Sequence, residues 1–259
     1  MMTAIGGLGT IVAALTLAWV ASVTLRDASI ADICWGPGFA LLACLYCLLS
    51  PTPTPRSWLA AGLITLWGAR LSVHIFLRNR GHGEDPRYRA MRAAHGSAFW
   101  WRSLLTVFWL QGLILWFVAL PLLVAVRAAH PAALTAVDGL GVALFAVGFG
   151  FEVVGDYQLR RFRADPSNRG RVLDRGLWRY TRHPNYFGDA TLWWGVYAIA
   201  AATPGGWLTV LSPALMTFLL MRVSGVTLLE QALTTSKPGY RAYIASTSAF
   251  VPWLPRGPH

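Results

Sequence analysis

Long apolar runs constrain this chain more than any other feature. A helix needs about 20 mostly apolar residues to cross a bilayer. Backbone groups in lipid must be satisfied within their own segment, so such runs should be helices. The sequence therefore predicts an all-α polytopic membrane protein, a bundle of seven transmembrane helices at residues 3–25, 33–50, 57–77, 104–126, 134–155, 187–203 and 207–225.

The overall composition agrees with a membrane protein. Hydrophobic residues make up 55% of the 259 residues and charged residues only 13%, whereas a soluble domain carries about 25% charged residues. We expect a single transmembrane domain over residues 1–259, ending in a cytoplasmic tail at 226–259.

Basic residues between the expected spans predict an orientation. The loop at 78–103 holds six arginines and the loop at 156–185 holds eight, while the other connectors hold almost none. With seven spans, both basic loops and the tail lie on one side, which the positive-inside rule makes cytoplasmic. We expect an integral protein of the bacterial inner membrane, with an extracytoplasmic N-terminus and a cytoplasmic C-terminus.

The net charge of +11 limits the classes of partner. All basic residues except Lys237 are arginines, whose planar fork suits phosphate groups. A GC-rich genome, together with arginines that act as cytoplasmic topology signals, would also explain an arginine excess. The remaining partners are anionic lipid headgroups and an anionic cofactor; nucleic acid is excluded because the charge lies in loops between spans.

Cysteine and histidine patterns predict neither a disulfide framework nor a metal site. Cys34, Cys44 and Cys47 lie in one apolar stretch, and an odd number there does not make a framework. The six histidines show no zinc-ligand spacing such as H-E-x-x-H.

Polar chemistry is concentrated at the start of the sixth expected span, in "LWRYTRHPNYFGDATLWWG" (177–195). Pro184 suits the first turn of a helix, where its missing N–H costs nothing. Asn185 and Asp189 are four residues apart and share a face of that helix, with Tyr186 on a neighbouring stripe. A helix N-terminus also favours an anion.

The preceding loop is dense in arginine. Asp156 and Arg160, with Arg163 one turn on, form either an ordinary ion pair at the interface or part of an anion site. A pyrophosphate or 2′-phosphate would use bidentate donors, and so would a lipid phosphate. The donors in this loop are Arg160, Arg163, Arg171, Arg179 and Arg182, together with Asn168.

Other polar residues lie at the same expected membrane face. Asp32 stands at the entry of the second span, where a charge is costly and often functional; alternatively, it is a helix cap with a solvated carboxylate. Arg70, His74 and Arg78 follow one helical stripe, although a lone histidine is more often packed than catalytic. Glu230 follows the last span closely enough to reach a site.

Several motifs resemble one enzyme family. "GLWRYTRHPNYFGDATLWWG", "DYQLRRFR", "SGVTLLE", "PGYRAY", "RNRGHGEDPRY" and "DICWGPGF" are similar to the bacterial membrane reductases of the steroid 5-alpha-reductase family. The resemblance implies seven transmembrane helices, with cytoplasmic loops closing over NADPH. It also implies reduction of the carbon–carbon double bond of a 3-oxo-delta-4 steroid or a similar enone lipid.

The resemblance, with the loop chemistry above, also assigns site residues. The substrate end departs from the family: mammalian members carry Q-E-x-P-S-F where this chain reads "CWGPGF", so Asp32, one turn from Trp35, is the candidate replacement for the family's acid. Trp35 and Arg70 are expected to bind substrate. The expected NADPH-binding residues are Asn79, Arg80, Asp156, Arg160, Arg163, Asn168, Arg171, Arg179, Tyr180, His183, Asn185, Tyr186, Asp189, Glu230 and Tyr240.

The implied reaction needs a proton donor. Hydride addition to an enone builds negative charge on the carbonyl oxygen, which a placed hydrogen-bond donor stabilises. A carboxylic acid can hold its proton in an apolar site. Asp32 is therefore the expected catalytic acid, with His74 as its partner or alternative. The soluble dinucleotide fingerprint G-x-G-x-x-G is absent in a strand–helix context, so arginines and loops would hold the cofactor.

Two other functions remain open at this stage. "RHPNYFG" also resembles the R-H-P-x-Y-x-G stretch of isoprenylcysteine carboxyl methyltransferases, membrane enzymes that use S-adenosylmethionine. A non-enzymatic lipid-binding protein would use the arginines only to grip headgroups. We expect a monomer that takes a hydrophobic, steroid-like substrate from the bilayer.

Overall fold

The computed structural model describes residues 2–223 and 225–256, and within them every regular element is a helix. The chain divides into two compact units. Unit 1 comprises residues 1–135 and 199–212; unit 2 comprises residues 136–198 and 213–259. Each unit is described by itself.

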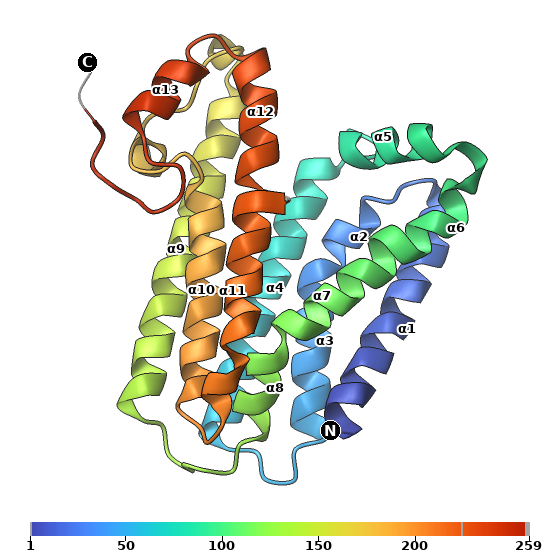
Figure 1. Cartoon of the computed structure of the whole chain (residues 1–259), viewed down its shortest axis with the longest axis vertical. Helices are drawn as coiled ribbons and strands as arrows, with labels where there is room; N and C mark the ends of the chain where they lie inside the picture. The colour runs from blue at the N-terminus through green and yellow to red at the C-terminus, as the bar shows by residue number, and fades with distance from the viewer. Residues whose placement is uncertain (1, 224, 257–259) are drawn as a thin grey trace. The chain divides into compact units, whose positions relative to one another are not determined.

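Unit 1 contains the first eight helices of the chain (Figure 1). A π-helical turn, Leu104–Trp109, joins α6 to α7, and a 3₁₀ turn, Gly206–Val210, also belongs to this unit. The helices are α1 (Met2–Leu25), α2 (Ile30–Ile33), α3 (Trp35–Leu48), α4 (Pro55–Asn79), α5 (Pro86–His95), α6 (Phe99–Ser103), α7 (Leu110–Val118) and α8 (Leu120–Arg127).

The start of α4 is set by its local sequence. Thr54 accepts from the backbone N–H of Ser57, the Ser57 hydroxyl bonds back to the Thr54 N–H, and Pro55 occupies the first turn. This reciprocal capping box satisfies two otherwise orphaned donors. The helix ends at Asn79, just before Gly81 and Gly83 adopt positive φ, a conformation that glycine reaches without strain.

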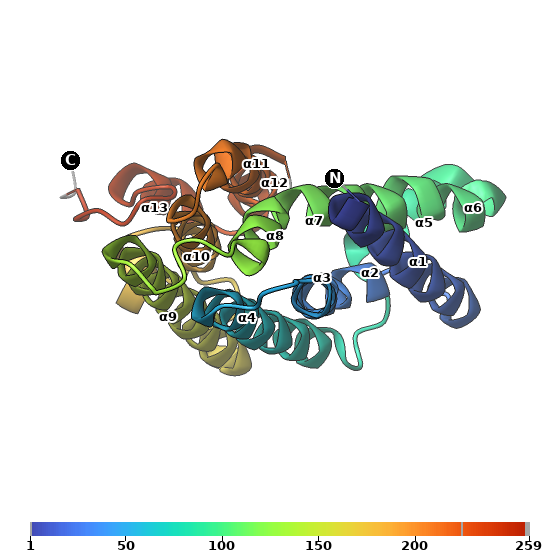
Figure 2. The same ribbon diagram turned by 90° about the horizontal axis from the view of Figure 1, so that it is seen from below.

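Helices α3 and α4 cross at backbone contact (Figure 2). A Cβ on Gly36 would lie 2.1 Å from the Gly68 carbonyl oxygen, and one on Gly68 would lie 2.5 Å from that of Gly36. Only glycine permits this approach. Phe39 and Trp67, whose rings meet edge to face at 5.6 Å, pack beside the crossing as part of the unit 1 core.

Unit 2 is built around α9 and α10, which approach each other closely. A Cβ on Gly148 would lie 2.4 Å from the Gly188 carbonyl oxygen, so this contact also requires glycine. Helix α10 begins at Pro184, as predicted. The helices that lie wholly or mainly in this unit are α9 (Ala136–Ala164), α10 (Pro184–Ala201), α11 (Leu211–Phe218), α12 (Val226–Ser236) and α13 (Tyr240–Ser246), with a π-helical turn at Leu219–Val223.

Among residues 2–223 and 225–256, five helical stretches are long and apolar enough to cross a membrane. Each of the seven expected ranges is mostly helical over its described residues, but α3 has only 14 residues and α10 is not among the five, so the count of seven and the orientation stay predictions. The five stretches are Met2–Leu25, Pro55–Asn79, Pro86–Val118, Ala136–Ala164 and Gly206–Val223.

Helix α9 runs nine residues past the expected end of its span, residue 155. Its last two turns carry Arg160, Arg161 and Arg163. Arginine is a good helix former, and no helix breaker occurs before Pro166. Charge therefore ends the apolar run without ending the helix.

Candidate functional site

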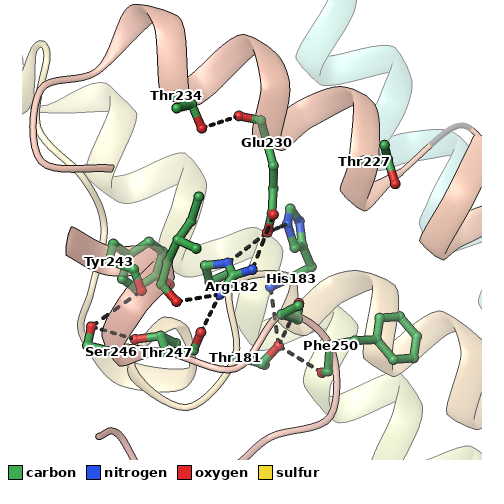
Figure 3. A network of polar contacts seen from close by, with 12 residues as sticks. Thr181, Arg182, His183, Thr227, Glu230, Thr234, Tyr243, Ser246, Thr247 and Phe250 are labelled. Atoms are coloured by element: carbon green, nitrogen blue, oxygen red, sulfur yellow. Dashed lines mark hydrogen bonds and ion pairs between the residues drawn. The ribbon is translucent and has the colours of Figure 1, made fainter. Parts of the chain in front are cut away.

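In unit 2, Arg182 and Glu230 form a bidentate ion pair (Figure 3). Arg182 Nε lies 2.7 Å from Glu230 Oε1, and the second terminal nitrogen lies 3.2 Å from Oε2. Arg182 stands directly before α10 and Glu230 lies on α12, so the pair ties two helices together. Two parallel charge-assisted bonds fix both side chains in one geometry.

The remaining donors of Arg182 hold the C-terminal segment. Its other terminal nitrogen donates to the carbonyl of Ile244 at 3.1 Å and to that of Thr247, and its backbone N–H donates to Ser248 at 2.9 Å. Thr181 donates to the Phe250 carbonyl at 2.8 Å. The sequence grouped Arg182 with the phosphate donors; in the structure this guanidinium binds the protein's own groups.

His183 joins the same carboxylate. Its Nε2 lies 3.1 Å from Glu230 Oε1, and its ring stacks on Tyr186 with centroids 5.6 Å apart. Burial by itself would raise the pKa of Glu230, but the hydrogen bonds from His183 and Arg182 outweigh burial and lower that pKa to about 2. Glu230 is therefore an anion that is bound by the Arg182 guanidinium and the His183 imidazole.

Helix α9 contributes Asp156 to this end of unit 2. Asn185 Nδ2, in the first turn of α10, donates to Asp156 Oδ1 at 3.2 Å. The carbonyl of Gly155, the residue before Asp156, accepts from the Trp178 indole at 3.1 Å, and Tyr243 donates to the Trp178 carbonyl. Asp156 and Asn185, which the sequence assigned to one cofactor site, are thus brought into direct contact.

Two tyrosines of the tail, Tyr240 and Tyr243, are packed rather than solvated. Tyr240 is buried, and its ring meets Tyr243 at 5.8 Å. Burial, reinforced by the negative charge of Glu230, raises the pKa of Tyr240 to about 12. Burial likewise raises the pKa of Tyr243. Both phenols therefore stay protonated at neutral pH.

The expected phosphate donors differ in exposure. Arg160, Arg163, Arg171 and Arg179 are exposed, as is Tyr180. Within residues 2–223 and 225–256, neither Arg171 nor Arg179 forms an ion pair with another side chain. These two guanidinium groups can accept an external anion.

Two further expected residues sit deeper. Asn168 is buried and donates from Nδ2 to the Phe162 carbonyl at 3.1 Å, which holds the loop against α9. Asp189 lies one turn beyond Asn185 on α10 and is half-buried. The Asn168 side chain therefore supports the arginine-bearing loop through its hydrogen bond to the backbone of α9.

In unit 1, Asp32 receives three donors. Arg87 donates to Oδ2 at 2.6 Å, the Tyr88 hydroxyl donates to Oδ1 at 2.6 Å, and Gln111 Nε2 approaches Oδ1 at 3.5 Å. Asp32 lies within α2, whose cap is Ser29. The alternative interpretation of Asp32 as a solvated helix cap is therefore wrong, because its carboxylate is bound by side chains of α5 and α7.

Sequence reasoning missed Tyr88 and Gln111. Tyr88 is buried, and Gln111 Nε2 donates to its hydroxyl oxygen at 3.1 Å. The π-helical turn at Leu104–Trp109 ends just before Gln111 and shifts the phase of the helix there; such turns often mark functional positions. A lone amide in the apolar run of α7 was the sequence signal that could have revealed Gln111.

The loop that leads into α5 is held by two acids. Glu84 accepts from the Ala28 N–H and from two nitrogens of Arg92, and Asp85 accepts from Arg87. Burial opposes ionisation at both carboxyls, but these bonds outweigh it and lower the pKa of each. The loop thereby fixes Arg87 and the neighbouring Tyr88 beside Asp32.

The other expected residues of unit 1 lie on α3 and α4. Trp35 meets Phe39 edge to face at 5.4 Å, and Arg70 and His74 follow one side of α4, which is tied to α2 by the Ser72 hydroxyl on the Ile33 carbonyl at 2.6 Å. Arg80 caps the end of α4 and is exposed.

Asn79 provides a test of whether the chain fits an anionic cofactor. Its Oδ1 accepts from Arg78 at 3.1 Å, whereas its buried Nδ2 has no hydrogen-bond partner among the described residues. A buried amide donor without an acceptor is costly. This donor fits a ligand that presents a phosphate or amide oxygen. In the described part of the chain, no group of three or more His, Cys, Asp or Glu could hold a metal ion.

Comparison with known proteins identifies a matching family model and a relative from fission yeast. The family model described as "Protein of unknown function (DUF1295)" matches residues 18–247. An uncharacterized protein of Schizosaccharomyces pombe is 28% identical over 263 aligned positions, covering 91% of this chain and 76% of the relative. No solved structure matches the chain significantly.

Proposed function

The chain belongs to the DUF1295 family of proteins of unknown function, and from this premise we propose that it is an NADPH-dependent membrane reductase. Its substrate would be a 3-oxo-delta-4 steroid or a similar enone lipid, and the reaction would saturate the carbon–carbon double bond. The observation that carries the proposal is the buried Tyr88 hydroxyl, held between Asp32 and Gln111.

The chemistry of an enone explains why this cluster matters. Hydride addition at the β carbon leaves negative charge on the carbonyl oxygen, and one proton completes the reduction. The Asp32 Oδ1 atom is approached by two donors, Tyr88 O–H and Gln111 N–H. A carbonyl oxygen that displaces Oδ1 would meet the same two donors, which is the arrangement that stabilises a developing oxyanion.

The ion pair between Arg87 and Asp32 bears on which residue donates the proton and which residue positions the donor. Arg87 lies 2.6 Å from Asp32, so we assign proton donation to Tyr88 and positioning to Asp32, in place of the donor role that the sequence suggested for Asp32. His74 remains the alternative donor. Trp35 and Arg70 would contact the substrate. This assignment keeps Asp32 in the site but gives proton donation to Tyr88, the residue whose hydroxyl contacts Asp32.

We assign cofactor binding to side chains whose hydrogen-bond donors are available to a ligand. NADPH supplies a hydride when bound. Arg171 and Arg179 would bind its phosphates, since arginine grips phosphate bidentately. The Asp156–Asn185 pair would orient polar groups of NADPH near the start of α10.

The test uses the full-length protein purified in detergent. NADPH is titrated first, followed by turnover with testosterone and progesterone, with mass spectrometry to detect a gain of two hydrogens. NADPH-dependent product supports the proposal. NADPH binding without product would still support a reductase but would contradict a steroid as its substrate.

Two outcomes would overturn the reductase. Binding of S-adenosylmethionine in place of NADPH would favour methyl transfer, the alternative that "RHPNYFG" suggests. Binding of neither nucleotide, with anionic lipids retained, would favour a lipid-binding protein. Loss of NADPH binding in Arg171→Ala or Asn185→Ala, with unchanged circular dichroism, would support the assigned residues.

A further inference from the structure

The C-terminal segment presents large apolar side chains to the exterior. Val251, Trp253 and Leu254 are 58%, 72% and 74% exposed, and we name them the C-terminal tip. They lie outside the five helical stretches that are able to cross a membrane. Exposed apolar side chains gathered in one short segment mark a contact surface rather than chance exposure.

The tip is held rigidly. The Trp253 N–H donates to the Tyr180 carbonyl at 2.9 Å, and the Arg182 N–H donates to the Ser248 carbonyl at 2.9 Å. Pro252 and Pro255 fix the backbone on either side of Trp253 and Leu254. Because the backbone is fixed, little conformational entropy remains to be lost when the tip meets its partner.

The depth of the tip follows from its attachment to α9. The 29 residues of α9 extend about 43 Å at 1.5 Å per residue, whereas the hydrocarbon core is about 30 Å thick. Counted from Ala136, that thickness ends near Gly155, which binds the Trp178 indole. Tyr180 follows two residues later and holds Trp253. With Ala136 taken as the start of the hydrocarbon core, this attachment would place the tip at the boundary between hydrocarbon and headgroups.

A small cavity with both polar and apolar lining residues opens beside the tip. Its volume is about 270 Å³, and its lining includes Ser246, Ser248, Trp253 and Arg256. Among the described residues, Arg256 forms no ion pair with another side chain. Hydroxyls and an unpaired guanidinium next to an exposed indole suit a phosphate headgroup at the interface.

We propose that the C-terminal tip inserts into the membrane interface and that the adjacent cavity binds the headgroup of an anionic phospholipid. The net charge of +11 favours an anionic surface. Tryptophan and tyrosine prefer the headgroup level, where one end of the ring is apolar and the other is hydrated. The tail would then be a second membrane attachment of unit 2, independent of the reductase proposal.

The first experiment measures the depth of Trp253 in full-length protein reconstituted into nanodiscs. The emission difference between the wild type and Trp253→Phe isolates the Trp253 signal. We expect lipids brominated near the headgroup end of the chain to quench that signal at least twofold, and aqueous iodide to quench it little. Trp58→Phe is the positive control, because Trp58 is exposed on α4, within an apolar stretch.

Two results would overturn the insertion. Quenching of Trp253 by iodide but not by brominated lipid would show that the tip is solvated. Shielding from both quenchers, with two copies per disc by light scattering, would show that a second copy covers the tip.

The second experiment tests the cavity by native mass spectrometry. Arg256→Gln should reduce retained phosphatidylglycerol about fivefold relative to phosphatidylcholine, whereas Arg241→Gln, an exposed arginine on α13, should leave it unchanged. Equal loss in both variants would overturn the headgroup site. Displacement of the lipid by millimolar inorganic phosphate would reassign the cavity to free phosphate.

Discussion

Arg182 and Glu230, 48 residues apart in sequence, meet through two hydrogen bonds of 2.7 and 3.2 Å. The Arg182 side chain is 7% exposed and that of Glu230 is 19% exposed. The same guanidinium binds the backbone of Ile244 and Thr247. One ion pair thus joins the start of α10, α12 and the C-terminal segment within unit 2.

The first prediction concerns the stability of this pair. Glu230→Ala should destabilise the protein by about 2–3 kcal/mol, below the 3–5 kcal/mol of a fully buried pair, because part of Glu230 reaches solvent. Thermal unfolding in detergent measures the loss. The adjacent exposed Gln231→Ala is the control, and an equal loss there would contradict a specific role for the ion pair.

The second prediction concerns acid. The pKa of Glu230 falls from its ordinary 4.5 to about 2 in the folded protein. A lowered folded pKa gives stability that is present above pH 4.5 and is lost as pH falls through 4.5 toward 2. The melting temperature should therefore drop between pH 5 and 3, and should drop less in Glu230→Gln. Parallel curves for both proteins would refute the assignment.

The third prediction tests the glycine crossing of α3 and α4. Gly68→Ala would place a Cβ 2.5 Å from the Gly36 carbonyl oxygen, a backbone atom that cannot swing away. We expect a loss of about 2 kcal/mol from overpacking. Gly62→Ala on the same helix meets nothing within 4 Å and should be neutral or stabilising by up to ~1 kcal/mol. Thermal unfolding distinguishes the two variants.

The fourth prediction concerns the proposed proton donor. Tyr88→Phe removes the hydroxyl that donates to Asp32 at 2.6 Å and should lower kcat about 100-fold or more, as expected for a general acid. NADPH affinity should change little. Steady-state turnover and NADPH titration are measured on the same preparation. Retained turnover in Tyr88→Phe, with loss in His74→Ala, would move the donor to His74.

The fifth prediction concerns the phosphate donors. Arg171→Ala and Arg179→Ala should each raise the Kd for NADPH about tenfold, the equivalent of one lost charge-assisted hydrogen bond. Arg241→Ala, at an exposed position of α13, serves as the matched control. Isothermal titration in detergent gives the three constants. A similar weakening in all three would indicate a general effect of charge rather than a site.

Local sequence was sufficient to predict the apolar helices, but not α5, α12 or α13. The apolar runs predicted helical segments at all seven ranges, and Pro184 marked the start of α10. These features depend on residues within one or two turns of each other, so propensity and burial are readable directly. The full extent of α9 was missed because charge ends an apolar run but does not end a helix.

Tertiary structure decided which polar side chains meet. Asp32 binds Tyr88, 56 residues away, and the Arg182–Glu230 pair spans 48 residues. No periodicity in a single sequence encodes such pairs, because they depend on how separate helices pack. The sequence by itself determined an all-helical, apolar, arginine-rich chain. Only the packing turned Arg182 inward onto Glu230, left Arg171 and Arg179 exposed, and placed Tyr88 against Asp32.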